Sequence, residues 1–166
     1  MFVTTHVLAG AAIGAATRRP LVGLVLGAAS HLALDAVPHW GGVTPSTFLA
    51  VAVADGLLGL AAMALTTRLA PPGLRTAVLA GAVGGALPDL DKPAELFVGR
   101  SPFPVAFDDI HGAIQREAPG WWWVEAGTAA LVVAVLLVLL TRAHDPAERE
   151  RHDTPRPGRG PESGAG

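Results

Sequence analysis

The sequence contains no cysteine, few aromatic residues and few charged residues, and the first and last of these shortages argue against particular classes of protein. Without cysteine there can be no disulfide framework, no thiolate nucleophile and no cysteine-ligated zinc site. Charged residues make up 16% of the chain, the formal net charge is -2 and no basic stripe is present, which argues against a nucleic-acid-binding protein. No lysine or arginine precedes the first apolar stretch, so we do not expect a cleaved signal peptide.

Alanine, glycine, valine and leucine dominate residues 1–142, whereas residues 143–166 are rich in proline, glycine and charges of both signs. The second segment has no apolar period and is predicted to be a disordered cytoplasmic tail. The first segment contains apolar helical stretches at residues 3–17, 20–37, 47–67, 74–87 and 121–141. A membrane-spanning helix needs about 20 residues, so the third and fifth stretches are long enough, and the glycines of the shorter ones suit close helix packing. The sequence therefore predicts an all-α, polytopic membrane bundle of about five helices.

The two halves of this body are similar to each other. When they are aligned, His6 lies over Asp55 and His39 lies over Asp89, with one single-residue gap. The pattern predicts two duplicated helical hairpins followed by a fifth helix, although two alanine- and glycine-rich helices can also be similar by accident.

Arginines mark one side of the predicted up-and-down bundle, and the positive-inside rule makes that side cytoplasmic. They occupy the first turn, flank the second turn and follow the last helix, at Arg18, Arg19, Arg68, Arg75, Arg142, Arg149 and Arg151. The candidate metal ligands then share the opposite, extracytoplasmic side. Three tryptophans, at residues 121–123, are expected to anchor the last helix at the membrane interface.

The clearest motif is His31-x3-Asp35-x2-Pro38-His39. Residues four apart share one face of a helix, so Asp35 can pair with either histidine. Residues eight apart lie about 12 Å apart along a helix, which is too far for one ion to bind both histidines. We expect Asp35 and His39 to bind metal near the membrane surface, with His31 deeper, either supporting them or binding a second ion. Pro38 can also swing His39 off the helix axis.

Ionisable residues inside an apolar bundle are costly, which makes the remaining motifs functional candidates as well. Asp89 and Asp91 follow Pro88 in a turn, and His111 with Gln115 forms one turn of a predicted surface helix. The predicted metal ligands are His6, His31, Asp35, His39 and Asp89, and the predicted catalytic residues are Asp91, as general base, and His111. A mixed set of histidine and aspartate suits zinc, manganese or iron, and zinc is the first choice for hydrolysis.

Several structural interpretations stay open. Asp55, in the third helix, is more often a hydrogen-bond partner of another helix than a metal ligand. His31 and Asp35 can join two helices or form steps of a proton path. Asp108 and Asp109 lie close enough to His111 in sequence to join the site.

The motifs Thr5-His6, His31-x3-Asp35-x2-Pro38-His39, Pro88-Asp89 and His111-x3-Gln115, in this order and spacing, resemble a group of small, largely uncharacterised bacterial inner-membrane proteins, the membrane-bound metal-dependent hydrolase-like family. The resemblance covers most of residues 3–125. It implies a metal-binding protein of the inner membrane more firmly than it implies a reaction. Lys92 and Asp108 stand where members of that family often carry a second histidine, so a non-catalytic relative stays open.

The sequence thus predicts metal-dependent hydrolysis at the extracytoplasmic membrane face, on a lipid or phosphoester whose phosphate Arg100 and Lys92 would hold. The alternative is a non-catalytic metal-binding or structural integral membrane protein. A third interpretation, a soluble helical binding module, requires the last apolar helix to be buried. The sequence leaves the oligomeric state open.

Overall fold

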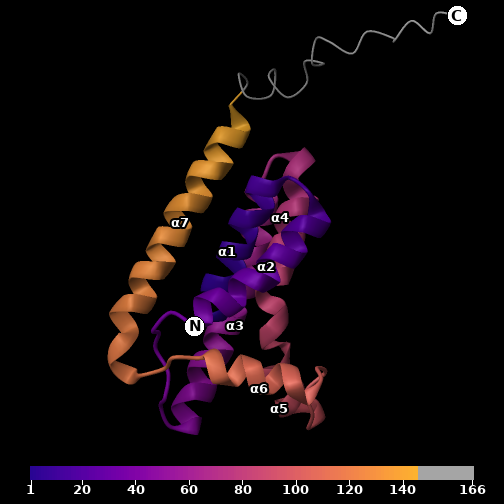
Figure 1. Cartoon of the computed structure of the whole chain (residues 1–166). Coiled ribbons are helices and arrows are strands. Elements are labelled where there is room, and N and C mark those ends of the chain that lie inside the picture. Colours follow the sequence, from indigo (N-terminus) through magenta and orange to yellow (C-terminus); the bar gives the residue numbers. More distant parts are fainter. Residues whose placement is uncertain (146–166) are drawn as a thin grey trace, which may run out of the picture.

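The computed structural model describes residues 1–145, and its regular structure there is helical, apart from one isolated bridge between His39 and Glu117. Figure 1 shows the helices α1 (Val3–Thr17), α2 (Pro20–Asp35), α3 (Pro45–Leu69), α4 (Arg75–Ala86), α5 (Asp91–Val98), α6 (Val105–Ile114) and α7 (Trp122–His144). Single 3-10 turns at Pro72–Leu74, Leu87–Leu90 and Pro119–Trp121 lead into α4, α5 and α7. The prediction of an all-α chain is confirmed for this part of the sequence.

The five predicted helices correspond to α1 to α4 and α7, with ends that differ by a few residues. Two further helices, α5 and α6, form in the segment that connects α4 to α7, and the predicted turn of helix at His111 is the last turn of α6. Of the predicted tail, residues 143 and 144 complete α7, and residues 146–166 lie outside the described part of the chain.

The short helices α1, α2 and α4 pack against one another with their backbones in close contact. A Cβ atom built at Gly10 would collide with the Gly81 carbonyl, one at Gly81 would collide with the Gly10 carbonyl, and one at Gly85 would collide with the His6 carbonyl. The buried apolar side chains between these helices are mostly alanine, with Val7 and Val78 among the larger ones. Glycine is needed here because any side chain would separate the helices, as in many membrane helix pairs.

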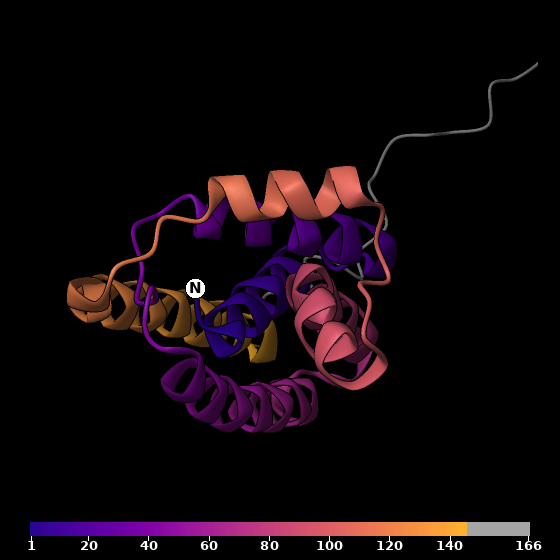
Figure 2. The same cartoon turned by 90° about the horizontal axis from the view of Figure 1, so that it is seen from below.

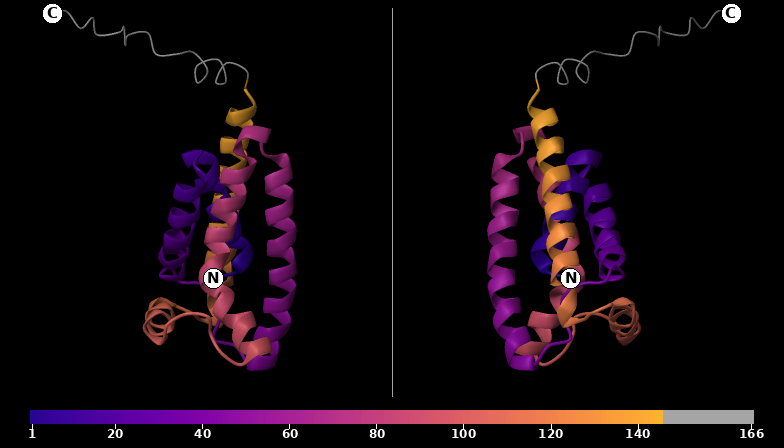
Figure 3. Two further views of the ribbon diagram at one scale, coloured as in Figure 1. Left: turned by 90° about the vertical axis from the view of Figure 1, so that its right-hand side faces the viewer. Right: turned by 90° about the vertical axis from the view of Figure 1, so that its left-hand side faces the viewer.

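The long helices α3 and α7 leave most of their apolar surface exposed. The most apolar stretches of Pro45–Leu69 and Pro119–His144 have mean hydropathies of 2.1 and 2.3, and only 6% and 17% of those stretches are buried. Figure 3 shows both as long rods beside the shorter helices. By length and composition these two helices can cross a membrane.

Each long helix contributes one inward carboxylate that holds the start of α1. Asp55 Oδ2 of α3 accepts a hydrogen bond from the Val3 backbone N–H at 2.6 Å. Glu125 Oε1 of α7 accepts from the Phe2 backbone N–H and from the Thr5 hydroxyl, each at 3.2 Å. The first amides of a helix have no partner within the helix and carry its positive dipole end, so these carboxylates stabilise α1 and fix its position.

The chain runs up and down between two ends with different chemistry. The turn from α1 to α2, the turn from α3 to α4 and the end of α7 lie at one end, and α5 and α6 lie at the other (Figure 1). Figure 2 shows that α6 runs crosswise to the bundle, on the side away from α3. The arginines of the described residues follow the predicted pattern and occupy the first of these ends, at Arg18, Arg19, Arg68, Arg75 and Arg142, apart from Arg100 and Arg116 near α5 and α6.

Candidate metal centre

Asp35, the last residue of α2, is the centre of a cluster of nitrogen atoms. Its Oδ1 atom lies 3.0 Å from His6 Nε2 and 2.9 Å from the Met1 amino group, and its Oδ2 atom lies 3.1 Å from His31 Nε2 and 3.0 Å from His111 Nε2. The side chain of Asp35 is only 1% exposed, and the three histidine side chains are 0–1% exposed. Residues from α1, α2 and α6 therefore meet at one buried carboxylate.

The hydrogen bond made by His31 Nδ1 shows which atom of the His31 ring faces the centre of the cluster with a lone pair. Its Nδ1 atom lies 2.7 Å from the Gly85 carbonyl oxygen and donates to it. In neutral His31, the Nε2 atom therefore carries a lone pair. That atom lies 3.1 Å from an Asp35 carboxylate oxygen and 3.2 Å from His111 Nε2. Acceptor atoms so close to each other in a buried site need protons or a cation between them.

Asp89 adds a second carboxylate at the edge of this cluster. Its Oδ1 atom lies 3.7 Å from His31 Nε2 and 3.9 Å from His111 Nε2, and its side chain is 20% exposed. Three overlapping groups have ligand atoms within 4.8 Å of one another, namely His6 with His31 and Asp89, His31 with Asp35 and His111, and Asp89 with Asp91 and His111. The buried histidines and aspartates can therefore hold a metal ion, and nitrogen with carboxylate oxygen is a donor set that zinc, manganese and iron accept.

Backbone hydrogen bonds hold α6 over the end of α2. The Arg116 N–H donates to the Asp35 carbonyl at 3.3 Å, the His39 N–H donates to the Arg116 carbonyl at 3.0 Å, and the Ala118 N–H donates to the His39 carbonyl at 3.1 Å. Residue 111 is one to two helical turns before this bridge. The bridge therefore positions His111 against Asp35, although the two residues are 76 positions apart.

His39 lies outside the cluster, in contrast to its predicted pairing with Asp35. Helix α2 ends at Asp35, and Pro38 follows in an irregular segment. The His39 Nδ1 atom lies 2.8 Å from the Val37 carbonyl, and its Nε2 atom faces Glu117 Oε1 at 3.8 Å. Since the helix stops before His39, Asp35 instead shares its face with His31, four residues earlier. No candidate metal group among residues 1–145 includes His39.

Asp91 lies behind His111, on the side of the ring that faces away from Asp35. Its Oδ2 atom is 3.6 Å from His111 Nδ1 and accepts a hydrogen bond from Lys92 Nζ at 2.7 Å. The Nδ1 atom of His111 has no hydrogen-bond partner among the described residues. A carboxylate behind a metal-binding histidine orients the ring and makes it a better ligand. Gln115 Nε2 also lies 3.3 Å from His111 Nε2, inside the cluster.

Two groups at the edge of the cluster, Asp89 and His111, favour their protonated forms when no ion is bound. Burial raises the pKa of the Asp89 carboxyl above its ordinary value. The hydrogen bond to the Asp35 carboxylate raises the pKa of His111 against the opposing effect of burial. A cation in the cluster would replace these protons, since metal ligands bind in their deprotonated forms.

The remaining predicted residues lie elsewhere. Asp55 caps α1, Asp108 accepts a hydrogen bond from the Ser101 hydroxyl at 3.0 Å, and Asp109 and Arg100 are exposed. Sequence reasoning missed Glu125, although a single carboxylate within a long apolar helix is a signal of an inward contact.

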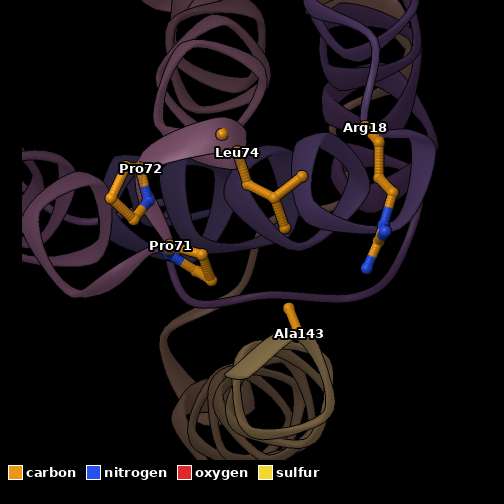
Figure 4. A pocket seen from close by; sticks show the side chains of 6 residues that line it. Arg18, Pro71, Pro72, Leu74 and Ala143 are labelled. Atoms are coloured by element: carbon orange, nitrogen blue, oxygen red, sulfur yellow. The ribbon is translucent and has the colours of Figure 1, made fainter. Parts of the chain in front are cut away.

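A separate hollow of about 380 Å³ lies at the opposite end of the bundle, lined by Arg18, Pro71, Pro72, Gly73, Leu74 and Ala143 (Figure 4). It contains none of the residues of the His/Asp cluster.

The chain matches no protein-family model, no curated protein and no solved structure. The function proposed below therefore depends on the geometry of the site, on the apolar surface and on the motifs.

Proposed function

We propose that this chain is a multi-pass protein of the bacterial inner membrane, in which α1 to α4 and α7 form the embedded bundle. The exposed apolar faces of α3 and α7 support this, because a soluble protein would bury helices of such hydropathy. Exposed leucines and valines also cover the outer face of α2, including Leu21 and Val25. The glycine contacts of the short helices support the same proposal, since small residues are the usual means of packing helices in lipid.

The functional proposal rests on the contacts of His6, His31 and His111 with the Asp35 carboxylate. In these contacts the lone pair of His31 Nε2 lies close to an acceptor oxygen of Asp35. A divalent ion held by His31, Asp35 and His111 would satisfy three of these groups at once, with His6 beside it and Asp89 at the open edge of the cluster. Zinc is the first choice for such a mixed donor set, with manganese and iron as alternatives.

We propose metal-dependent hydrolysis as the activity. When bound, the ion would supply Lewis acidity and a water of lowered pKa. Asp91 would keep the His111 ring in place, and Asp89, the most exposed carboxylate of the cluster, would accept the proton of the attacking water. The location beside the crosswise helix α6 and the resemblance to the hydrolase-like family support a lipid or phosphoester as substrate, at the extracytoplasmic face (Figure 2).

A metal centre without a reaction is the second candidate, and the burial of the ligands favours it. Structural metal sites are closed by protein ligands, whereas catalytic ones keep an open position. His6, His31, Asp35 and His111 are all 0–1% exposed, and Asp89 alone gives access. In that case the ion would join α1, α2 and α6 and stabilise the bundle.

A measurement of bound metal tests the premise that both candidates share, namely that the cluster binds a metal ion. The full chain, purified in mild detergent without added metal or tag histidines, is analysed by elemental mass spectrometry beside Asp35→Asn. Asp108→Asn is the matched control, because Asp108 also accepts a hydrogen bond but lies outside the candidate groups. We expect near-stoichiometric divalent metal in the wild type and the control, and little in Asp35→Asn. Absence of metal from all three after reconstitution with excess zinc, manganese or iron would contradict both candidates.

Asp89→Asn separates the two candidates. If the protein is a hydrolase, the metal-loaded wild type cleaves a phosphoester or phospholipid, and Asp89→Asn loses most of that activity while it retains metal. If the ion is structural, metal raises the unfolding temperature of both proteins and neither cleaves any substrate of these classes.

A further inference from the structure

We propose that the hollow at the arginine end binds the phosphate group of an anionic phospholipid, with Arg18 as its main ligand. This hollow lies between the turn after α1, the start of α4 and the end of α7, and Figure 4 shows the Arg18 side chain extended along it. It is at the end of the bundle opposite the His/Asp cluster, so the proposal adds a second site to the protein.

The backbone of Arg18 is the first observation. Arg18 has φ 57° and ψ 10°, and it is the only residue other than glycine with a positive φ in residues 1–145. Its N–H still donates to the Gly14 carbonyl at 3.0 Å, and its left-handed backbone ends α1. Glycine is the usual residue at this position of a helix end, because a side chain strains the left-handed conformation. The left-handed backbone costs free energy at an arginine, and a ligand bound by the guanidinium would offset that cost.

The second observation is that this guanidinium has no partner among the described residues. No hydrogen bond or ion pair joins it to another group of residues 1–145, whereas Arg75 donates to the Ala70 and Arg68 carbonyls at 3.2 and 3.3 Å. The other side chains around the hollow are apolar, and none of the described lining residues is acidic. A half-buried guanidinium above an apolar floor suits a phosphate, which its planar fork can bind through two hydrogen bonds.

The start of α4 supports the same ligand. Gly73 and Leu74 line the hollow immediately before α4, and no side chain caps this helix. Pro71 and Pro72 have no N–H, and the Leu74 N–H donates to the Pro71 carbonyl at 2.8 Å, so the amide of this turn that can donate to an anion is that of Gly73. Arg18 and the Gly73 N–H thus supply two donors at one hollow.

The surroundings point to a lipid as the source of the phosphate, and this step depends on the proposed membrane location. Apolar faces of α2 and α7 leave room for acyl chains beside the bundle, and basic pockets between helix ends are known binding sites of anionic headgroups. Inorganic phosphate shares the same chemistry, so the test includes it.

The test measures the unfolding temperature of the full chain in neutral detergent while phosphatidylglycerol, phosphatidylcholine or inorganic phosphate is added. Arg18→Gly removes the guanidinium and leaves a residue that accepts the left-handed backbone, so the fold is retained. Arg19→Gln is the matched control, because it removes the same charge from the neighbouring exposed residue. We expect stabilisation by phosphatidylglycerol above that by phosphatidylcholine. The apparent affinity should fall about tenfold in Arg18→Gly and stay within about twofold in Arg19→Gln, since a charged hydrogen-bonding group is lost only in the first.

Ala143→Leu is a second variant, which fills the hollow without changing any charge and should also abolish the response. Asp35→Asn should keep the response, which separates this site from the metal centre. Equal losses in Arg18→Gly and Arg19→Gln, or equal stabilisation by both lipids, would overturn the site. A response to inorganic phosphate as strong as that to phosphatidylglycerol, and lost in Arg18→Gly, would overturn the assignment to a lipid.

Discussion

The short helices α1, α2 and α4 differ from the long helices α3 and α7 in how they use their surfaces. The short helices face one another through glycine and alanine, and two of them carry His6, His31 and Asp35 of the cluster. The long helices expose leucine and valine along most of their length and direct one carboxylate each, Asp55 and Glu125, toward α1. Close backbone contact and buried polar groups thus occur together, because only tightly packed helices bring polar side chains from different segments within bonding distance.

The largest effect is expected from a substitution that disrupts the packing of the short helices. Gly81→Ala places a Cβ atom on the Gly10 carbonyl, whereas Gly56→Ala in α3 meets nothing within 4 Å. We expect Gly81→Ala to lose about 3 kcal/mol of stability, or to fail to fold, because the clash involves backbone atoms on both sides. Gly56→Ala should unfold at or slightly above the wild-type temperature, because alanine favours a helix. Thermal unfolding in detergent measures both, and equal stabilities would contradict the contrast between the two sets of helices.

A smaller effect is expected when the carboxylate at the centre of the cluster is removed. Asp35→Asn takes one charge from a group that contacts three histidines. Metal affinity should fall by about 100-fold or more, because changes even to residues behind metal ligands cost 10- to 100-fold. Competition with a chelator of known affinity gives the ratio. An affinity within threefold of the wild type would show that the ion binds elsewhere.

Asp91 tests whether the centre also depends on α5, which belongs to neither set of helices. Asp91→Asn weakens the electrostatic support of the His111 ring and leaves its size unchanged. Metal affinity should fall about tenfold, as expected for a residue that acts through a ligand. The same chelator competition applies, with Asp109→Asn, on the exposed side of α6, as the control. A loss as large as that in Asp35→Asn would make Asp91 a direct ligand.

Asp55 tests the contribution of the long helices. Asp55→Asn removes the charge that faces the first amides of α1 and should destabilise the protein by about 1 kcal/mol, as the loss of a helix cap does. Its metal affinity should stay close to that of the wild type, since Asp55 lies outside the cluster. Chemical or thermal unfolding and chelator competition are measured on the same preparation. Loss of metal without loss of stability would show that Asp55 supports the metal centre and not the start of α1.

The smallest expected effect is the pH dependence of the metal-free protein. The raised pKa values of His111 and Asp89 favour the protonated forms in the fold. Their contribution to stability is therefore present at low pH and is lost as pH rises through the raised values. Metal affinity should change in the opposite direction and increase with pH, because the ion displaces the same protons. Unfolding titrations of the wild type and of His111→Gln between pH 5 and about 8 give the contribution of His111 as a difference, and chelator titrations of the wild type give the slope of metal affinity. A contribution of His111 that grows with pH would contradict this prediction.

Part of the candidate site could be predicted from the spacing of its residues along the sequence. His31 and Asp35 are four residues apart in an apolar helix, and this is enough to predict that they share a face. His39 was favoured as the partner of Asp35 because the two residues are four positions apart, whereas α2 stops at Asp35 and His39 faces Glu117. His111 was recognised as a candidate by its residue type, but its contact with Asp35 depends on a backbone bridge that no local pattern announces.

Sequence by itself determined the five apolar helices, the short lengths of α1, α2 and α4, the apolar character of α3 and α7, and the separation of most arginines from the ligand candidates. These properties depend on neighbouring residues and on hydropathy, which act over one or two helical turns. Only the tertiary structure decided that His6 and His111 join His31 at Asp35, that His39 faces Glu117, and that Asp55 caps α1. Such contacts join residues tens of positions apart, and they follow from the close approach of glycine-lined backbones, which sets the distances between side chains from different helices.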